Sequence, residues 1–401
     1  MKRVLIFSLN YYPRFVGGAE VAIKEITDRI SDIEFHMVTL RFDSNLPKVE
    51  KVGNVLVHRI GPTRKNPSIA NLRKFPLHLN KYLYQYLAGR KAAALHRKYS
   101  YDAIWAMMAH SSGIPAANFK SSHKDVPYLL TLQEGDPPEY IERMMKPVWP
   151  FFKRAFTTAD HIQTISTFLL KWARSMGFSG KASVIPNAVN IEHFSQVFSQ
   201  KMVEEMKQRL GKKEGDMYMV TTSRLVHKNA VDDVIRSLSL LPHSVSFLIY
   251  GIGPDEEKLR SLAAEIGVSD RARFMGYIDH TEMPLMFSAC DIFIRPSRSE
   301  GMGNSFVEAF AAGLPVIATQ EGGIADFFFD ERRNPEKETT GWAVDADSPE
   351  QIAEAVKDIL ERPDKVTKVI RNAKELALSK YDWNLIAGDM QTLFKELLGT
   401  R

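Results

Sequence analysis

The sequence has 401 residues, of which 44% are hydrophobic and 25% charged, with a formal net charge of +5. These values are typical of a soluble globular protein with two domains, and apolar runs no longer than a strand argue against a transmembrane helix. The single cysteine, Cys290, excludes an internal disulfide. The apolar run after Lys2 and Arg3 is too short for a signal peptide. We therefore expect a cytoplasmic protein.

Short apolar runs of strand length alternate with helical patterns through the first half of the chain. The expected strands there are residues 4–9, 35–40, 103–108, 128–133 and 161–166. The pattern is interrupted around Pro186 and then restarts. The expected strands of the second half are residues 217–223, 245–251, 272–278, 291–297 and 315–319. This alternation predicts an α/β fold of two doubly wound, Rossmann-like domains, which we place at residues 1–187 and 188–380.

Two glycines follow the first expected strand. Gly17 and Gly18 directly precede a helical pattern that starts near Ala19. Without a Cβ in the way, backbone amides at such a helix N-terminus approach a diphosphate closely. Taken alone, a Gly-Gly pair before a helix is only weak support for a phosphate contact.

Charge is distributed unevenly along the chain. Residues 1–190 carry 27 Lys and Arg against 14 Asp and Glu, whereas residues 191–401 carry 26 against 34. Residues 64–101 contain nine Lys or Arg and no acidic residue. Apolar residues recur in this stretch at helical spacing, namely Phe75, Leu79, Leu83, Tyr86 and Leu87. We therefore expect a basic amphipathic helix, which is either an ordinary solvated helix or a surface for an anionic partner.

The anionic partner of this stretch would be a membrane surface carrying a lipid-linked acceptor, or a phosphorylated or acidic acceptor. The residues that we assign to this surface are Arg73, Lys74, Lys81, Arg90 and Lys91. Nucleic acid is not an expected partner, because no RNP, KH or helix-turn-helix pattern accompanies the charge.

A second basic constellation follows the strand expected at residues 217–223. Arg224 ends that strand, and Lys228 lies four residues later, before a helical pattern. A planar guanidinium and a compact ammonium at one site suit a diphosphate that gains charge as its bond to a sugar breaks. The alternative interpretation is that both are surface cations of a loop.

Residues 297–319 are the most informative stretch of the chain. Glu300 and Glu308 are separated by seven residues, around a glycine-bearing turn that leads from an apolar strand into a helix closing at Gly313. Such a junction directs backbone amides and the positive end of a helix dipole at an anion above the loop. Glu308 can accept hydrogen bonds from the vicinal hydroxyls of a ribose, while Glu300 stands on the opposite lip of the loop.

These residues resemble the donor-binding motif of the retaining glycosyltransferases of family 4, in which E-x7-E is followed by A-x-G-x-P-V-I-A. The similarity extends over nearly the whole chain. It implies the GT-B fold, in which two Rossmann-like domains face a central cleft and a last helix, here within residues 381–401, crosses back to the first domain. It also implies transfer of a sugar from a nucleotide-diphosphate sugar.

The resemblance assigns roles to individual residues. Glu300 would contact the transferred sugar and Glu308 the ribose, while Arg224 and Lys228 would hold the leaving diphosphate. The loop with Gly17 and Gly18 would overhang the phosphates of the donor. Further donor-binding positions, in loops that seat phosphate and nucleobase, are Gly251, Gly253, Ile278, Gly301, Met302, Gly303, Asn304 and Ser305.

The chain departs from the family pattern at two places. Ser223 and Asn229 replace the two glycines of the G-R-L-x-x-x-K-G signature, and the spacing from arginine to lysine is one residue shorter. Many members carry a histidine where this chain has Gln133. A side-chain amide can hydrogen-bond a sugar hydroxyl, but it does not take up or release a proton, so it is no acid or base. The neighbouring Glu134 and Asp136 are either site residues or only turn residues.

We therefore expect a retaining, metal-independent transferase that needs no cofactor and moves a sugar to a glycan or lipid-linked acceptor in cell-surface polysaccharide or glycolipid synthesis. A UDP-sugar is slightly favoured over a GDP-sugar as donor, and the enzyme would lie in the cytoplasm or on the inner face of the membrane. No metal is expected, because Arg224, Lys228 and helix N-termini would take its place, and the one D-x-D, Asp345 and Asp347, lies away from the donor motifs. The alternatives are a nucleotide-sugar epimerase of the same fold and a non-catalytic binding module.

Overall fold

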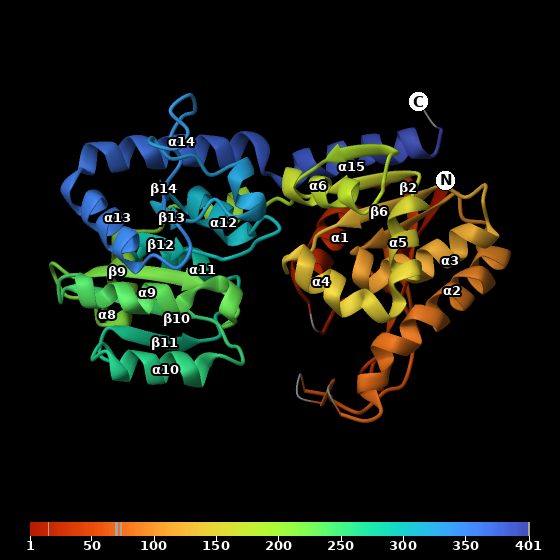
Figure 1. Ribbon diagram of the computed structural model, residues 1–401, viewed down its shortest axis with the longest axis horizontal. Helices are drawn as coiled ribbons and strands as arrows, with labels where there is room; N and C mark the ends of the chain where they lie inside the picture. The colour runs from red at the N-terminus through yellow and green to blue at the C-terminus, as the bar shows by residue number, and fades with distance from the viewer. Residues whose placement is uncertain (15, 69–70, 73, 400–401) are drawn as a thin grey trace. The chain divides into compact units, whose positions relative to one another are not determined.

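The computed structural model describes residues 1–14, 16–68, 71–72 and 74–399. Two compact units make up the chain: Met1–Asn187 together with the residues from Trp383 onward, and Ala188–Asp382. Each unit is a mainly parallel β-sheet flanked by helices, which confirms the predicted fold class (Figure 1).

The first unit contains an eight-stranded sheet in the order β3-β4-β2-β1-β5-β6-β7-β8. Its strands are β1 (Lys2–Phe7), β2 (Ile33–Leu40), β3 (Val49–Val52), β4 (Val55–Ile60), β5 (Ala103–Met107), β6 (Tyr128–Leu132), β7 (His161–Thr164) and β8 (Lys181–Val184). All neighbours pair in parallel except β3, which forms an antiparallel hairpin with β4. The sequence analysis did not predict β3, β4 or β8.

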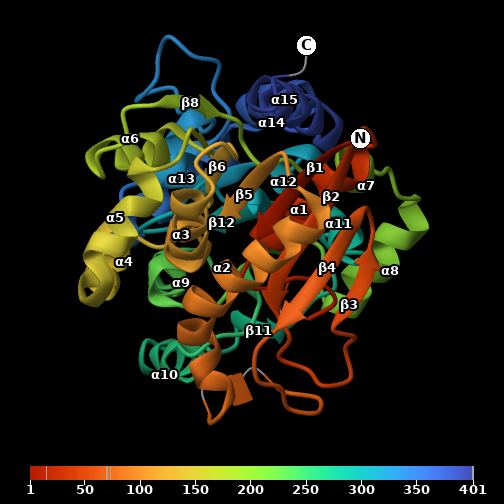
Figure 2. The same ribbon diagram turned by 90° about the vertical axis from the view of Figure 1, so that its right-hand side faces the viewer.

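Helices pack on this sheet, and the C-terminal helix is one of them. They are α1 (Gly18–Arg29), α2 (Asn80–Tyr99), α3 (Ile114–Ser122), α4 (Pro138–Met145), α5 (Trp149–Thr157), α6 (Thr167–Ser175) and α15 (Trp383–Leu397). In α15, the ring of Phe394 packs against Phe35 and Trp105 from two strands of the sheet. Figure 2 shows the ribbon of α15 next to the strands of this unit. Throughout the described ranges, no helix has the length and apolarity needed to cross a bilayer.

The predicted apolar stripe of the basic stretch is wrong. Phe75 and Tyr86 are 76% and 57% exposed, and the buried side of α2 consists of Asn80, Tyr84, Ala88, Ala92 and Leu95. Small alanines let the helix lie close to the sheet, and the Tyr84 hydroxyl is satisfied by the Ser8 and Val38 carbonyls at 3.1 and 2.9 Å. The sequence interpretation gave weight to large apolar residues, of which Phe75 and Tyr86 are exposed, whereas Leu79, Leu83 and Leu87 are half-buried.

The basic side chains assigned to this surface can be placed individually. Lys74, Lys81 and Arg90 are exposed, and Lys91 is half-buried. The Arg90 guanidinium lies 4.4 Å from the ring centroid of Tyr86. Arg73 lies outside the described residues.

The second unit contains a six-stranded parallel sheet in the order β11-β10-β9-β12-β13-β14. Its strands are β9 (Met217–Thr222), β10 (Val245–Tyr250), β11 (Ala272–Gly276), β12 (Ile292–Arg295), β13 (Val316–Ala318) and β14 (Trp342–Ala343). Its helices are α7 (Ile191–Phe194), α8 (Gln200–Leu210), α9 (Val231–Ser237), α10 (Glu256–Glu265), α11 (Met283–Ser288), α12 (Asn304–Ala312), α13 (Pro349–Glu361) and α14 (Pro363–Lys380).

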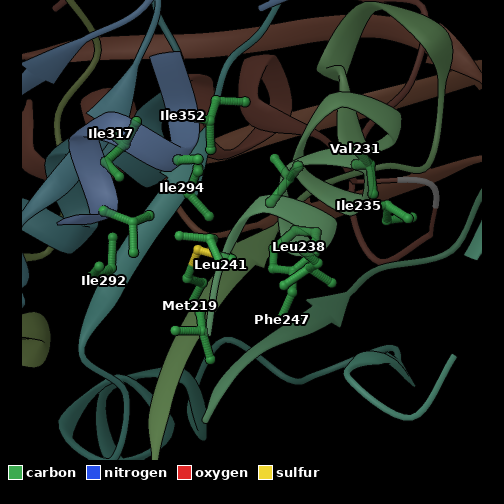
Figure 3. Packing of buried hydrophobic residues seen from close by; sticks show 14 of the residues in the cluster. Met219, Val231, Ile235, Leu238, Leu241, Phe247, Ile292, Ile294, Ile317 and Ile352 are labelled. Carbon is green, nitrogen blue, oxygen red and sulfur yellow. The ribbon is translucent and has the colours of Figure 1, made fainter. Parts of the chain in front are cut away.

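Apolar runs make up the central strands of this sheet, because both of its faces are covered. Met219, Phe247 and Ile294 from three strands pack with Ile235 of α9 and Ile352 of α13 (Figure 3). This packing fixes the positions of the strands, and therefore also the points from which the loops leave their carboxyl ends.

Candidate functional site

The second unit has a topological switch point between β9 and β12. β9 lies at the centre of the sheet, with β10 on one side and β12 on the other. In open α/β sheets, ligands bind outside the carboxyl ends of the strands at such a point. The loops that leave β9 and β12 carry the predicted Arg224, Lys228 and Glu300, so one edge of one sheet brings these three residues together.

A backbone hydrogen bond connects the two loops across the switch point. The Arg298 amide, after β12, donates to the Lys228 carbonyl at 2.7 Å. Arg224 is exposed, and its guanidinium makes no ion pair with any described residue, whereas Lys228 is half-buried. The Asn229 side-chain amide donates to the Arg224 carbonyl at 2.7 Å, so the residue that replaces the family glycine stabilises this turn.

Two predicted glycines are required by the fold itself. An added Cβ on Gly251 would lie 1.8 Å from the Ser223 carbonyl oxygen, and one on Gly253 would lie 2.1 Å from the Leu225 carbonyl oxygen. The turn after β10 therefore passes directly against the loop after β9. These glycines shape the site through backbone packing, whatever contacts they make with a ligand.

Glu300 belongs to a buried ion pair that the sequence analysis missed. Its Oε1 lies 3.0 Å from Nη2 of Arg295, and the two side chains are 11% and 8% exposed. The Ser297 hydroxyl donates to the same oxygen at 3.3 Å. Arg295 ends β12 inside an apolar run, and that position was the available sequence signal: a cation there needs a buried partner.

The turn into α12 has the predicted strand–loop–helix form. Gly303 adopts φ 85°, α12 begins at Asn304, and the helix closes at Gly313 with φ 78°. Gly301, Met302 and Ser305 are buried, while Gly303 and Asn304 are half-buried. The first amides of α12 therefore lie next to the loop that holds Glu300.

Glu308 has a partner that was not foreseen. Its Oε1 lies 3.2 Å from Nε2 of His280, in the loop after β11. The predicted Ile278 is half-buried in the same loop, beside the exposed Tyr277. A ribose at Glu308 would therefore be flanked by the loop that the resemblance assigns to the nucleobase.

Arg298 organises the acidic residues around the β9 loop. Its guanidinium contacts Asp232 at 2.9 Å, Asp233 at 3.1 Å and Asp347 at 2.7 Å. Burial, followed by the neighbouring Asp232, raises the pKa of Asp233 to about 6. Asp345 instead pairs with Arg333 at 3.0 Å, so both carboxylates of the D-x-D motif take part in ion pairs.

Buried polar atoms without a protein partner gather at this switch point. They include the hydroxyls of Thr221, Thr222, Ser223 and Ser305, the Oδ1 of Asn229 and the Nε of Arg295, judged over the residues that the structure describes. Buried polar groups in proteins are nearly always hydrogen-bonded, so such a concentration is typical of a site for a polar ligand.

The first unit has its own switch point, where β1 lies between β2 and β5. The predicted Gly17 and Gly18 follow β1 there. The Gly17 amide donates to Oε2 of Glu20 at 2.7 Å, and burial raises the pKa of this carboxyl. An added Cβ on Gly18 would meet no atom within 4 Å, so the fold itself does not require glycine at position 18.

Gln133 lies at the end of β6, also in the first unit. Its side-chain amide pairs with that of Asn187 through bonds of 2.9 and 3.2 Å. The adjacent Glu134 is buried and accepts from the Ala109 amide at 2.6 Å, with His110 Nδ1 at 3.4 Å from the same oxygen. His110 was not among the predicted site residues, although a histidine directly after an expected strand was a usable signal.

Comparisons with known proteins agree with this architecture. The family model Glycosyltransferase Family 4 matches residues 16–193, and the model Glycosyl transferases group 1 matches residues 202–376. A GDP-mannose-dependent alpha-(1-6)-phosphatidylinositol monomannoside mannosyltransferase of Mycobacterium tuberculosis is 28% identical, over 55% of this chain and 57% of its own length.

Two solved structures cover the whole fold. Sucrose-phosphate synthase from Thermosynechococcus elongatus is similar over 100% of both chains, with a TM-score of 0.81 and 20% identity. Anabaena HepE, in complex with UDP-glucose, is similar over 99% of this chain and 100% of its own, with a TM-score of 0.77 and 19% identity. The chain therefore belongs to the family 4 glycosyltransferases and has their GT-B fold.

Proposed function

We propose that this glycosyltransferase is a retaining, metal-independent enzyme that takes its sugar from a nucleotide-diphosphate sugar. The observation that carries the proposal is the β9–β12 switch point, where cationic side chains, helix N-terminal amides and buried unpaired polar atoms lie on one sheet edge. A sugar nucleotide offers the diphosphate, hydroxyls and base that such a site can bind.

The roles of the residues follow from what they can donate or accept. Arg224 and Lys228 would neutralise the diphosphate as it leaves, and the first amides of α12 add fixed donors. Glu308 would accept from the ribose hydroxyls, sharing its carboxylate with His280. Glu300 would accept from the transferred sugar through the oxygen that Arg295 does not hold.

In the proposed reaction, the sugar carbon loses its bond to the phosphate oxygen and gains one to the acceptor oxygen on the same face. The acceptor's proton passes to the leaving phosphate oxygen, so the products are the glycosylated acceptor and a nucleoside diphosphate. The protein's task is to align donor and acceptor and to stabilise the developing charge. Cationic side chains supply that stabilisation, which is the basis for proposing metal independence.

For the donor and the acceptor, we propose chemical classes rather than single compounds. The mannosyltransferase relative is named for GDP-mannose and a lipid acceptor, whereas HepE was solved with UDP-glucose. We propose a UDP-sugar in preference to a GDP-sugar, and a glycan or lipid-linked acceptor in polysaccharide or glycolipid synthesis. The epimerase alternative finds no support in these relatives.

A nucleotide-release assay tests the proposal. With UDP- and GDP-sugars and a panel of glycan and glycolipid acceptors, release should rise when the correct acceptor is present and should persist in excess EDTA. The anomeric configuration of the product, determined by NMR, should match that of the donor. An inverted product, or complete loss in EDTA that magnesium restores, would contradict the mechanism.

A further inference from the structure

Large apolar side chains project from one helical segment of the first unit. α4 and α5 are joined by the short turn η4 (Lys146–Val148) and run from Pro138 to Thr157. Tyr140, Met144, Val148 and Phe151 are 49%, 46%, 38% and 51% exposed. They are the exposed large apolar residues of this segment, two in α4, one in the connecting turn and one in α5. We call these four residues the α4–α5 outer face.

Other residues of the same segment belong to the core of the unit. Ile141, Met145, Phe152 and Phe156 are buried, and α5 packs against α3 (Figure 1, yellow and orange). The segment therefore carries large apolar side chains both in the core and at the surface, and packing within the unit explains only the buried ones. Ordinary surface helices carry polar side chains at their exposed positions.

Cations are interspersed with the apolar side chains. Arg143, Lys146 and Lys153 are exposed, and the Arg143 guanidinium lies 5.9 Å from the ring centroid of Tyr140. Of the two acidic residues in the segment, Glu139 is exposed, whereas Glu142 accepts a hydrogen bond from the indole of Trp172 at 2.9 Å. The exposed charge around the outer face is therefore predominantly positive.

We propose that the α4–α5 outer face is a membrane-contact surface, which inserts its apolar side chains into a bilayer that contains anionic lipids. Such a bilayer offers acyl chains to the apolar side chains and negative headgroups to the flanking cations, in adjacent layers. The inference is separate from the β9–β12 switch point, because all of the residues of the outer face lie in the first unit.

Trp149 makes this surface directly observable. The chain contains five tryptophans, and Trp105, Trp172, Trp342 and Trp383 are buried. Trp149 is half-buried and lies next to Val148 at the start of α5. Quenching of tryptophan fluorescence by brominated acyl chains would therefore report on insertion of this segment.

The experiment uses the full chain and vesicles of equal parts phosphatidylglycerol and brominated phosphatidylcholine. We expect quenching that disappears in a Trp149→Phe variant, although that variant still sediments with the vesicles. The combined variant Tyr140→Ser, Met144→Ser, Val148→Ser and Phe151→Ser should bind at least about tenfold more weakly, because it loses most of its insertable apolar area. Binding should weaken but persist in about 1 M salt, where headgroup attraction is screened.

Two matched variants sharpen the result. Four exposed apolar residues of the second unit serve as the control, changed together as Val197→Ser, Leu240→Ser, Leu360→Ser and Leu378→Ser, and this variant should bind like wild type. The second replaces the basic stretch, as Lys74→Gln, Lys81→Gln, Arg90→Gln and Lys91→Gln. Unchanged melting temperatures would show that each variant is folded.

Several outcomes would overturn the proposal. One is a wild-type protein that does not bind the vesicles, and another is loss of binding only in the basic-stretch variant. Light scattering that shows a dimer, broken by the outer-face variant, would assign the surface to a second copy of the chain instead.

Discussion

The two switch points of the molecule are built differently. In the second unit, the loops after β9 and β12 are held by the buried Arg295–Glu300 pair, by the ion pairs of Arg298 and by glycines in close backbone contact. In the first unit, the loop after β1 leads into α1 at Gly18, where an added Cβ would meet nothing within 4 Å.

This difference separates residues that the fold needs from residues that only a ligand needs. Glu300 and Gly251 are embedded in the second unit, so changing them should cost stability as well as activity. Arg224 and Gly18 have no comparable structural role, so changing them should cost activity alone. The first four predictions below test this separation, from the largest expected effect to the smallest.

Glu300→Gln should destabilise the protein by about 3–5 kcal/mol, because it leaves the buried Arg295 guanidinium without its counter-charge. Chemical denaturation measures this free energy of unfolding. The matched control is Glu331→Gln, which removes a more exposed partner of Lys365 and should cost about 1 kcal/mol or less. Equal losses for the two variants would show that the Arg295–Glu300 pair does not hold the loop.

Arg224→Ala should lower turnover by about two to three orders of magnitude, comparable to the loss of one preorganised donor. Its unfolding free energy should stay close to wild type, since the side chain is exposed. Steady-state kinetics at saturating donor provide the measurement, with the exposed Arg371→Ala as control for the loss of one positive charge. Near-wild-type turnover of Arg224→Ala would remove Arg224 from the diphosphate site.

Glu308→Gln should weaken binding of the free nucleotide by about 1.5–3 kcal/mol, the range for hydrogen bonds to a charged group. Calorimetry on the folded variants measures this loss directly. Glu300→Gln should reduce sugar transfer more than nucleotide binding. A larger binding loss for Glu300→Gln than for Glu308→Gln would mean that the two roles are reversed.

Gly251→Ala and Gly18→Ala form a pair with opposite expectations. The first forces a Cβ against the Ser223 carbonyl at φ 143° and should cost about 1–2 kcal/mol of stability or more. The second should leave stability within about 0.5 kcal/mol but raise KM for the donor, if phosphate approaches this backbone. Thermal unfolding and donor titrations separate these effects, and a destabilised Gly18→Ala would contradict the contrast between the two loops.

The fold was largely predictable because apolar strand-length runs alternate with helical patterns. β3 and β4 were missed, since no helix separates β2, β3 and β4 along the chain, and β3 is an antiparallel strand at the sheet edge. The stripe on α2 was misplaced, because burial there depends on Tyr84 and small alanines rather than on the largest apolar residues.

The placement of Glu300 and Glu308 around one strand–loop–helix turn was predictable, because one local motif carries both residues. The supporting contacts of the site were not, because they join residues distant in sequence. Arg298 reaches Asp232 and Asp347, and His280 reaches Glu308, through pairings that depend on the order of strands in the sheet.

A thermal-shift screen of UDP, GDP, ADP and their sugars tests the central claim most directly. At about 100 times its dissociation constant, a ligand of the native state adds roughly 2.7 kcal/mol, so the correct nucleotide should raise the melting temperature clearly. At the same ligand concentration, the shift should shrink in Arg224→Ala and Glu308→Gln and persist in Arg371→Ala. If no nucleoside diphosphate or nucleotide sugar stabilises the wild-type protein, or if Arg224→Ala responds like wild type, the β9–β12 switch point is not the donor site.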